Sequence, residues 1–314
     1  MFYKKDLRPA RGLLIDASQL GVLRFAIVDP LAPGIRDVQQ LDVSNIATFT
    51  DALQLYAQGN GLTLRGLRCV MAVASVTAGD TIVVGRTRWT LVRSGLGAIF
   101  GHPVTIINNV AARAWALTTS QATFESVRGQ GAPNFRRQGR YALINVDQGV
   151  GCAVIDVDHS GQIRILETEP GHTDFFPTSD AEARIAESVK GSARFATWEK
   201  MLVIDRHSSA WSAGGPTAMV GQRHRFLAAI LGRFAVNLVN TYGAWQGVLV
   251  TGHTANLLKG VGRSAFDGAF QQPCHFSRLV SACPAWHVEQ KQAVLTGAAQ
   301  CLGQEIALEF PAAA

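Results

Sequence analysis

Two residues with the chemistry to bind a sugar, Glu169 and His172, lie three positions apart in the chain. Between them stands Pro170-Gly171, a pair typical of a turn, so a bend there would let both side chains reach one small molecule. Each hydroxyl of a sugar donates and accepts hydrogen bonds, and carboxylates and imidazoles supply the matching groups. An ordinary surface turn, with Glu169 in solvent and His172 packed on Phe175, fits the same residues equally well.

Segments with strand and helix patterns flank this turn. Upstream, residues 141–155 contain two apolar runs around a Gly-x-Gly bend, which predicts a β-hairpin. Downstream, residues 180–189 have the pattern of an amphipathic helix, and residues 226–240 repeat apolar residues at helical spacing. Residues 118–140 are polar and contain glycine, so we expect an exposed loop there.

The first third of the chain shows strands followed by strand–helix alternation. Residues 12–18 and 24–29 predict a hairpin, and residues 69–74 and 104–107 predict buried strands. The last of these leads into a helix near Ala111, which makes an α/β pattern. With 314 residues, the chain is long enough for about two domains.

The composition indicates a globular protein with a large core. Hydrophobic residues make up 47% and charged residues 17% of the chain, and no apolar run reaches the roughly 18 residues of a membrane helix. The first residues lack the apolar segment of a secretory signal, so we expect a cytoplasmic protein. The cysteines are scattered, odd in number and without a Cys-x-x-Cys pair, which predicts reduced thiols and neither disulfides nor a metal site. They are Cys69, Cys152, Cys274, Cys283 and Cys301.

A net charge of +6 and a pI near 9.3 are compatible with nucleic-acid binding. Lysine and arginine are spread along the chain, however, and the clusters at residues 4–5 and 136–140 have no recognition-helix, finger or aromatic–basic motif beside them. We therefore expect no nucleic-acid partner, and the mild positive field favours anionic small molecules instead.

Residues 169–175, Glu-Pro-Gly-His-Thr-Asp-Phe, resemble the Glu-Gly-Gly-His-x-Asp-Phe signature of the bacterial hexokinase-type glucokinases, a family of the actin-like sugar-kinase superfamily. The resemblance extends in unbroken order over about residues 12–305. It implies a two-domain α/β fold of the actin-like ATPase (ribonuclease H-like) type with an interdomain cleft. The small domain would comprise residues 1–112, completed by a C-terminal helix at 291–305, and the large domain residues 113–290. We also expect a homodimer.

The resemblance implies that four residues contact glucose or a related hexose: Asn108, Glu169, His172 and Glu199. All four keep the residue types of the family. Glu199 lies in residues 198–202, Trp-Glu-Lys-Met-Leu, which resemble the family's Ala-Glu-Arg-Val-Leu. A lone glutamate on a helix is otherwise usually solvated, and Asn108 would serve equally well as the N-cap of the helix near Ala111.

The position of the family's general base departs from the pattern. Asn109 stands where the family has the aspartate that takes the proton from the sugar 6-hydroxyl. A carboxamide can hydrogen-bond a hydroxyl, but it cannot accept its proton at neutral pH. Loss of general-base help costs about 10²–10⁴ in rate.

The nucleotide-facing positions implied by the resemblance are Asp16, Gln148, Gly149, Gly151 and Gly252. The family's first phosphate turn, Asp-x-Gly-Gly-Thr-Asn, is replaced by Asp-Ala-Ser-Gln-Leu-Gly at residues 16–21, and a plain hairpin turn explains it. In the second turn Asp147 places a negative charge where polyphosphate would lie, while the glycines there also suit a tight hairpin. His253 follows Gly252 where the family has a second glycine, and its imidazole would crowd the base.

Three hypotheses follow from these residues. The first is a hexose-binding pseudokinase, with phosphoryl transfer lost or impaired and no cofactor. The second is an active ATP:D-glucose 6-phosphotransferase with divergent phosphate loops, which would use Mg-ATP. The third is a scaffold or dimerisation module without a small ligand. The retained sugar-side residues argue against the third, and Asn109 with Asp147 argues against the second, so the sequence favours the first.

Overall fold

The computed structural model describes residues 11–29, 34–84, 87, 89–119, 121–203 and 220–309. The first ten residues, on which the expectation about a secretory segment rests, lie outside this part of the chain. The chain forms two compact units, the first made of residues 1–121 and 290–314 and the second of residues 122–289. The expected domain boundary at residue 112 falls inside a helix, α3 (Asn109–Leu117), which belongs to the first unit.

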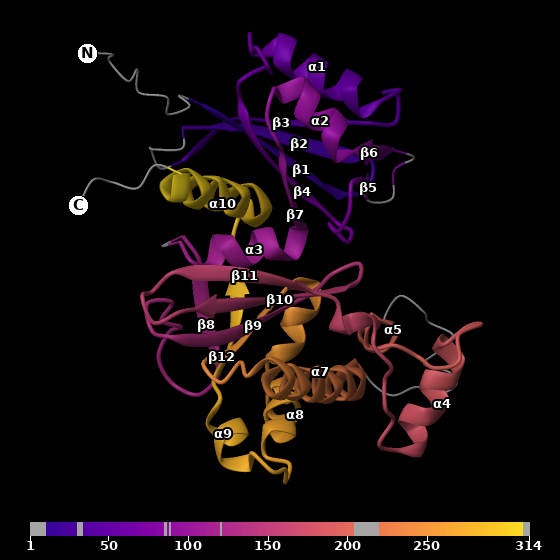
Figure 1. Ribbon diagram of the computed structural model, residues 1–314. Coiled ribbons are helices and arrows are strands. Elements are labelled where there is room, and N and C mark those ends of the chain that lie inside the picture. Colours follow the sequence, from indigo (N-terminus) through magenta and orange to yellow (C-terminus); the bar gives the residue numbers. More distant parts are fainter. Residues whose placement is uncertain are drawn as a thin grey trace. The chain divides into compact units, whose positions relative to one another are not determined.

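A five-stranded sheet forms the centre of the first unit (Figure 1). In spatial order its strands are β3 (Ile35–Asp42), β2 (Val22–Val28), β1 (Gly12–Gln19), β4 (Arg68–Val73) and β7 (Thr105–Asn108). The first three strands of the chain form an antiparallel meander, and β4 and β7 run parallel to β1. The hairpin and the two buried strands predicted from the sequence are therefore confirmed.

Helices cover both faces of this sheet. Successive side chains of a strand point to opposite faces, and here both faces carry apolar side chains that helices bury. The helices are α1 (Phe49–Gly59), α2 (Arg93–Phe100), α3 and α10 (Ala293–Glu309), and a short hairpin of β5 (Thr81–Val83) and β6 (Thr90–Val92) precedes α2. Leu13 packs with residues of α1 and α2, whereas its neighbour Leu14 packs with residues of α3 and α10. Gly297 lets α10 approach α3 closely, since a Cβ there would lie 1.6 Å from the Ala112 carbonyl oxygen.

A six-stranded sheet forms the centre of the second unit. In spatial order its strands are β11 (Ile163–Thr168), β10 (Val150–Val157), β9 (Gly139–Val146), β12 (Gly247–Thr251), β13 (Ala285–Glu289) and β8 (Thr123–Arg128). The hairpin predicted at residues 141–155 is confirmed as β9–β10. The loop expected over residues 118–140 is wrong in part, because β8 pairs antiparallel with β13. As an edge strand it is paired on one side only and tolerates a polar composition like that of a loop.

The two sheets repeat one topology. In each, an antiparallel meander (β1–β2–β3 or β9–β10–β11) is followed by two strands parallel to its first strand (β4 and β7, or β12 and β13). The β1–β2 and β9–β10 hairpins therefore occupy equivalent places in the two units. These hairpins carry Asp16 and Asp147, two of the residues discussed above for the nucleotide side.

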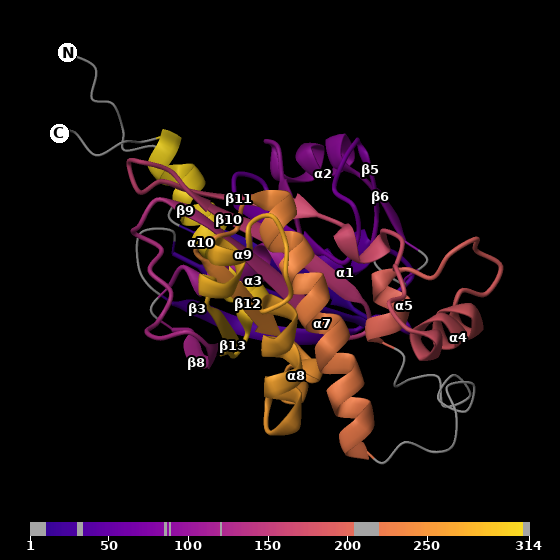
Figure 2. The ribbon, with the colours of Figure 1, turned by 90° about the horizontal axis from the view of Figure 1, so that it is seen from below.

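The long helix α7 (Val220–Tyr242) packs against the sheet of the second unit, with α8 (Val261–Phe270) beside it (Figure 2). Leu231 and Phe234 of α7 share one buried core with Ile144 and Val146 of β9. The remaining helical segments are η1 (Pro170–His172), α4 (Asp180–Val189), α5 (Trp198–Leu202), η3 (His253–Leu258) and α9 (Ser277–Ala282). The helices predicted at residues 180–189 and 226–240 are confirmed as α4 and as part of α7.

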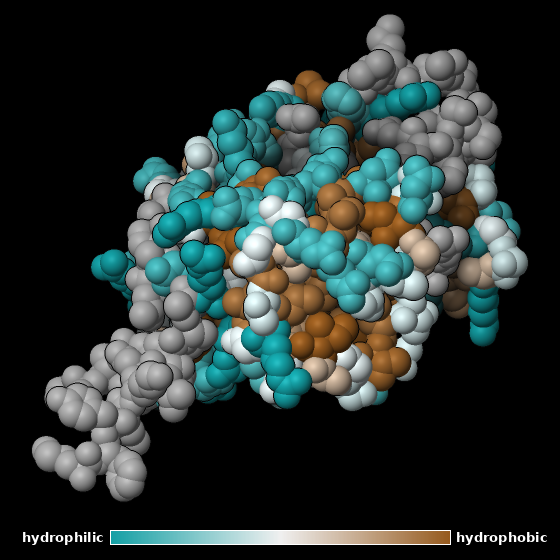
Figure 3. All heavy atoms as spheres, turned by 90° about the horizontal axis from the view of Figure 1, so that it is seen from above, coloured by the Kyte–Doolittle hydropathy of each residue, from teal (hydrophilic) through white to brown (hydrophobic). Residues whose placement is uncertain are grey.

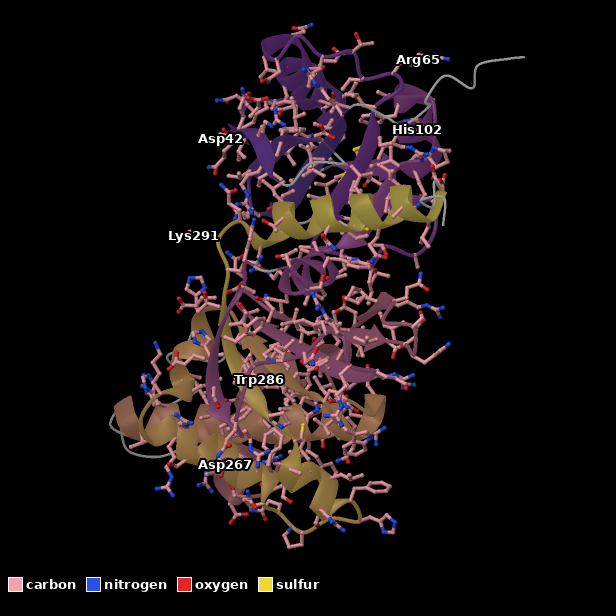
Figure 4. All side chains as sticks on the ribbon, turned by 90° about the vertical axis from the view of Figure 1, so that its left-hand side faces the viewer. Asp42, Arg65, His102, Asp267, Trp286 and Lys291 are labelled. Atoms are coloured by element: carbon pink, nitrogen blue, oxygen red, sulfur yellow. The ribbon has the colours of Figure 1, made fainter. Side chains whose placement is uncertain are left out.

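Most large apolar side chains lie in these cores, and some reach the surface. Figure 3 shows apolar side chains gathered in one area of the face that it views, ringed by hydrophilic ones. Trp286 of β13, labelled in Figure 4, is buried, and its indole donates a hydrogen bond to the Gly131 carbonyl at 2.8 Å.

Among the described residues, no helix combines the length and the hydrophobicity needed to cross a membrane.

Candidate functional site

Glu199 is fixed against the turn that joins β9 and β10. Its helix, α5, follows Thr197, whose hydroxyl accepts a hydrogen bond from the Lys200 amide at 3.3 Å. The Oε2 atom of Glu199 accepts a hydrogen bond from the Val150 amide at 2.9 Å. A Cβ at Gly149 would lie 2.6 Å from that oxygen, so the glycine leaves the room that the carboxylate fills. Glu199 is therefore partly buried and bonded, and not simply solvated.

His172 lies between the carboxylates of Glu169 and Glu199. Its Nε2 atom is 3.7 Å from Oε2 of Glu169, and its Nδ1 atom is 4.0 Å from Oε1 of Glu199. The exposed fractions of the side chains are 59% for His172, 38% for Glu169 and 28% for Glu199, so a ligand can reach all three. The structure thus brings together, from η1 and α5, three of the four residues expected to contact a sugar.

The Pro-Gly turn rests on the first residue of β10. A Cβ at Gly171 would lie 2.6 Å from the Val150 carbonyl oxygen, so η1 can approach this closely only with glycine there. Beyond the turn, the Phe175 amide donates a hydrogen bond to the Ala196 carbonyl at 2.8 Å. The Phe175 ring is buried edge-on against Trp198 of α5, with 4.9 Å between the ring centroids. These contacts hold the segment that carries His172 close to the helix that carries Glu199.

Burial raises the pKa of the Glu169 carboxyl above its ordinary value of 4.5. His172 opposes this rise, whereas the carboxylates of Glu199 and Glu167 add to it. Ionised Glu169 is therefore less favourable in the folded chain than in water. A ligand that donated hydrogen bonds to these carboxylates would offset part of that cost.

Asn108 and Asn109 lie in the first unit, where β7 meets α3. Asn108 is buried and caps the helix, since its Oδ1 atom accepts a hydrogen bond from the Val110 amide at 2.7 Å. Its Nδ2 atom donates to the Ser75 carbonyl at 3.4 Å. The capping role considered for Asn108 is therefore observed. Asn109 is the half-buried first residue of α3, and the roles of both residues toward a sugar remain predictions.

Asp16 is held inside its own hairpin. It is 1% exposed and lies opposite Arg24 in the β1–β2 ladder, where the two side chains form an ion pair. Its Oδ1 atom also accepts hydrogen bonds from the Ser18 amide at 3.0 Å and the Ser18 hydroxyl at 2.6 Å. Both carboxylate oxygens of Asp16 thus have partners within the hairpin.

Asp147, after β9, pairs with His253. Its Oδ1 atom is 2.8 Å from Nδ1 of His253 and accepts a hydrogen bond from the His253 amide at 3.1 Å. The His253 side chain is 94% exposed. The residue that replaces a family glycine therefore contacts the aspartate of the second phosphate turn.

The other nucleotide-side positions of the second unit lie around the same hairpin. A Cβ at Gly252, whose φ is +99°, would lie 2.3 Å from the Val146 carbonyl oxygen, so close packing requires glycine there. Gln148 is exposed in the turn, and Gly151 pairs with Asn145 in the β9–β10 ladder. Their roles toward a nucleotide remain predictions.

Sequence reasoning missed a pocket of about 730 Å³ within the second unit. It is bounded by the end of β11, η1, α5 and the C-terminal part of α7, and Glu169 lines it. His172 and Glu199 are not among the described residues that line it. The available signal was a set of polar residues at helical spacing, Asn237, Asn240 and Thr241, in a helix that is otherwise largely apolar.

The chain resembles glucokinases along most of its length. A family model described as Glucokinase matches residues 22–203 and 211–305. A glucokinase from Stenotrophomonas maltophilia (strain R551-3) is 29% identical over 308 residues, which cover 88% of this chain and 90% of that protein. These matches span both units of the structure.

Solved structures of glucokinases share the fold. The structure of a glucokinase from an Antarctic psychrotroph has a TM-score of 0.71 and 17% identity, covering 94% of this chain and 99% of that one. A glucokinase from Balamuthia mandrillaris, solved in complex with glucose, has a TM-score of 0.67 and 14% identity, covering 94% and 93% of the two chains. The α/β fold of the actin-like sugar kinases, expected from the sequence, is therefore confirmed.

We expect Gly149→Ala to lower the free energy of unfolding by about 1–3 kcal/mol, because the added methyl group overlaps the Glu199 carboxylate. In a Glu199→Ala background the same change should cost much less, since the overlapping oxygen is gone. Urea denaturation of wild type, both single variants and the double variant measures this coupling. Equal costs in the two backgrounds would show that the carboxylate does not occupy the space above Gly149.

Glu169→Gln should stabilise the chain at neutral pH. The raised pKa means that the folded chain favours the protonated carboxyl, so wild type loses stability as the pH rises from 4.5 through the pKa of the folded state. The glutamine variant has no such loss and should match wild type only below pH 4.5. Melting temperatures of both proteins across this range test the effect, with Glu187→Gln on α4 as an exposed control. A difference in melting temperature between wild type and Glu169→Gln that stayed constant with pH would contradict this prediction.

Proposed function

Because the chain belongs to the glucokinase family, we propose that it binds glucose or a related hexose. The observation that carries this proposal is the cluster of Glu169, His172 and Glu199, with the imidazole at 3.7 and 4.0 Å from the two carboxylates. Asn108 of the first unit is proposed as a further contact. The glucose complex of the Balamuthia mandrillaris glucokinase supports a hexose as the ligand.

The cluster offers the groups that a hexose needs. Carboxylates accept hydrogen bonds from hydroxyls, and a neutral imidazole can donate one and accept another. Oε2 of Glu199 accepts a hydrogen bond from the Val150 amide, and Oε1 lies 4.0 Å from Nδ1 of His172. Because the backbone already fixes this carboxylate, hexose binding would cost little side-chain ordering.

We propose that phosphoryl transfer is lost or strongly impaired in this chain. Asn109 cannot act as the general base. Asp16 is ion-paired with Arg24, and Asp147 is paired with His253, so each carboxylate already has a partner within its own unit. A nucleotide with its cation would have to compete with these contacts, and the residues present fit Mg-ATP poorly.

An active ATP:D-glucose 6-phosphotransferase that uses Mg-ATP is the second candidate. The observation in its favour is the extent of the match. The family model described as Glucokinase matches residues 22–203 and 211–305 of this chain, and a relative named glucokinase matches 88% of it. Positioning and charge stabilisation supply most of the catalysis of phosphoryl transfer, so an altered base need not abolish it.

Hexose binding can be measured by calorimetric titration with glucose. We expect saturable binding to wild type that weakens by about 1–3 kcal/mol in Glu169→Ala, because a sugar hydroxyl loses its acceptor. Glu187→Ala, which removes an exposed carboxylate of α4 in the same unit, should bind like wild type. If wild type takes up no glucose at millimolar concentration, the proposed hexose site is wrong.

The two candidates differ most sharply at Asn109. We expect neither wild type nor Asn109→Asp to form glucose 6-phosphate from glucose and Mg-ATP in a coupled assay, because the restored carboxylate would have no bound γ-phosphate to act with. Mg-ATP titration of both proteins should accordingly be flat to millimolar concentration. Wild-type turnover on the order of 1 s⁻¹, as ordinary kinases show, would establish the active enzyme instead. Activity in Asn109→Asp alone would show that the nucleotide side is intact and that only the base is missing.

A further inference from the structure

The pocket beside α7, here called the α7 pocket, adjoins the proposed hexose site and shares Glu169 with it. Its volume of about 730 Å³ is within the usual range for small-molecule sites. Neither His172 nor Glu199 is among the described residues that line it. The function proposed above therefore uses one residue of this pocket, Glu169, and leaves the rest of its lining without a role.

The α7 pocket combines aromatic surface with polar walls. Trp198 of α5 and Phe234 of α7 line it and are buried, whereas the Phe176 side chain in its lining is 80% exposed. The Phe176 ring is therefore the aromatic surface that a ligand could contact, and such a ring suits the C–H face of a sugar, which is apolar while its edge carries hydroxyls. Small-molecule sites are commonly built in this way, with a few placed polar groups around apolar and aromatic side chains.

The polar groups come from two directions. Glu167 of β11, Glu169 just before η1 and Asp174 just after it contribute carboxylates. The last turns of α7 contribute two exposed carboxamides, Asn237 and Asn240. Ligand hydroxyls could donate to the carboxylates and accept from the carboxamide N–H groups at the same time.

One polar group of the α7 pocket lacks a hydrogen-bond partner among the described residues. This group is the buried hydroxyl oxygen of Thr168. A ligand hydroxyl that reached it would remove the cost of leaving that oxygen unpaired.

The charge of the lining narrows the class of ligand. None of the described residues that line the pocket is lysine or arginine, and the nearby Arg233, which donates a hydrogen bond to the Phe176 carbonyl, is already ion-paired with Glu182. Sugar phosphates and nucleotides would be repelled there. An organic cation would be attracted to the carboxylates, but it offers no acceptor to the N–H groups of Asn237 and Asn240. A neutral polyhydroxylated molecule matches both walls.

We propose that the α7 pocket is a second carbohydrate site, which binds a neutral saccharide without contact to His172 or Glu199. It goes beyond the proposed function, because its occupant would lie away from His172 and Glu199. The two sites share Glu169, so variants that discriminate between them must leave that residue unchanged.

The test is a set of calorimetric titrations with glucose, maltose and trehalose, and with spermidine as a cationic probe. Three variants are compared with wild type. Glu199→Gln disables the hexose cluster while keeping an acceptor for the Val150 amide, Asn237→Ala/Asn240→Ala disables the α7 pocket, and the third variant combines these changes. His224→Ala is the matched control, because His224 is an exposed residue of the same helix outside the pocket lining.

We expect at least one saccharide to bind Glu199→Gln and His224→Ala as it binds the α7 pocket of wild type. The same saccharide should lose about tenfold or more of this affinity when Asn237→Ala/Asn240→Ala is added to Glu199→Gln. The proposal is overturned if Glu199→Gln binds none of the three saccharides at millimolar concentration, if the asparagine variants leave binding unchanged, or if spermidine alone binds. Glucose binding that Glu199→Gln leaves intact but the asparagine variants abolish would support the α7 pocket and refute the hexose cluster instead.

Discussion

The hydrogen bond from the Val150 amide to Glu199 is the contact on which the candidate sugar site depends. Val150 is the first residue of β10, and its carbonyl oxygen is the atom against which Gly171 lies. One residue of a sheet strand thus fixes both the helix that carries Glu199 and the turn that carries Glu169 and His172. Sites supported by strands and helices hold their geometry more accurately than sites on loops alone. The proposed acceptors for a hexose are accordingly positioned by the protein itself.

The two units repeat one sheet topology, but the first hairpins of their sheets differ in the carboxylates that they contact. In the second unit, the turn after β9 supports a carboxylate that comes from another element, Glu199. In the first unit, Asp16 is paired with Arg24 directly across the ladder, so the charge is neutralised within the hairpin itself. Asp147, in the turn between β9 and β10, instead pairs with His253 of η3, which lies 106 positions away in the chain. These contacts are the structural support for the proposal that phosphoryl transfer is impaired in this chain.

Elements with strong apolar periodicity could be predicted from the sequence, as α4, α7 and the β9–β10 hairpin show. The strand β8 could not, because an edge strand exposes polar residues much as a loop does. Family resemblance drew attention to Glu199. The close approach of Glu199 to Gly149 could not be predicted, because it depends on the contact of Glu199 with Val150, which lies 49 positions away in the chain. The α7 pocket was missed for the same reason, since β11 and the end of α7 are distant in sequence and meet only after folding.

The glycines of the second phosphate turn have a consequence for how such chains diverge. Replacing Gly149 would set a side chain against a carboxylate oxygen, and replacing Gly252 would set one against the Val146 carbonyl. Selection for folding alone would therefore preserve both glycines in a lineage that had stopped using nucleotides. Glycine at positions 149 and 252 therefore does not distinguish an active kinase from one that has lost its activity. A change of use would show instead at the positions of this turn that are not glycine, such as Asp147 and Gln148.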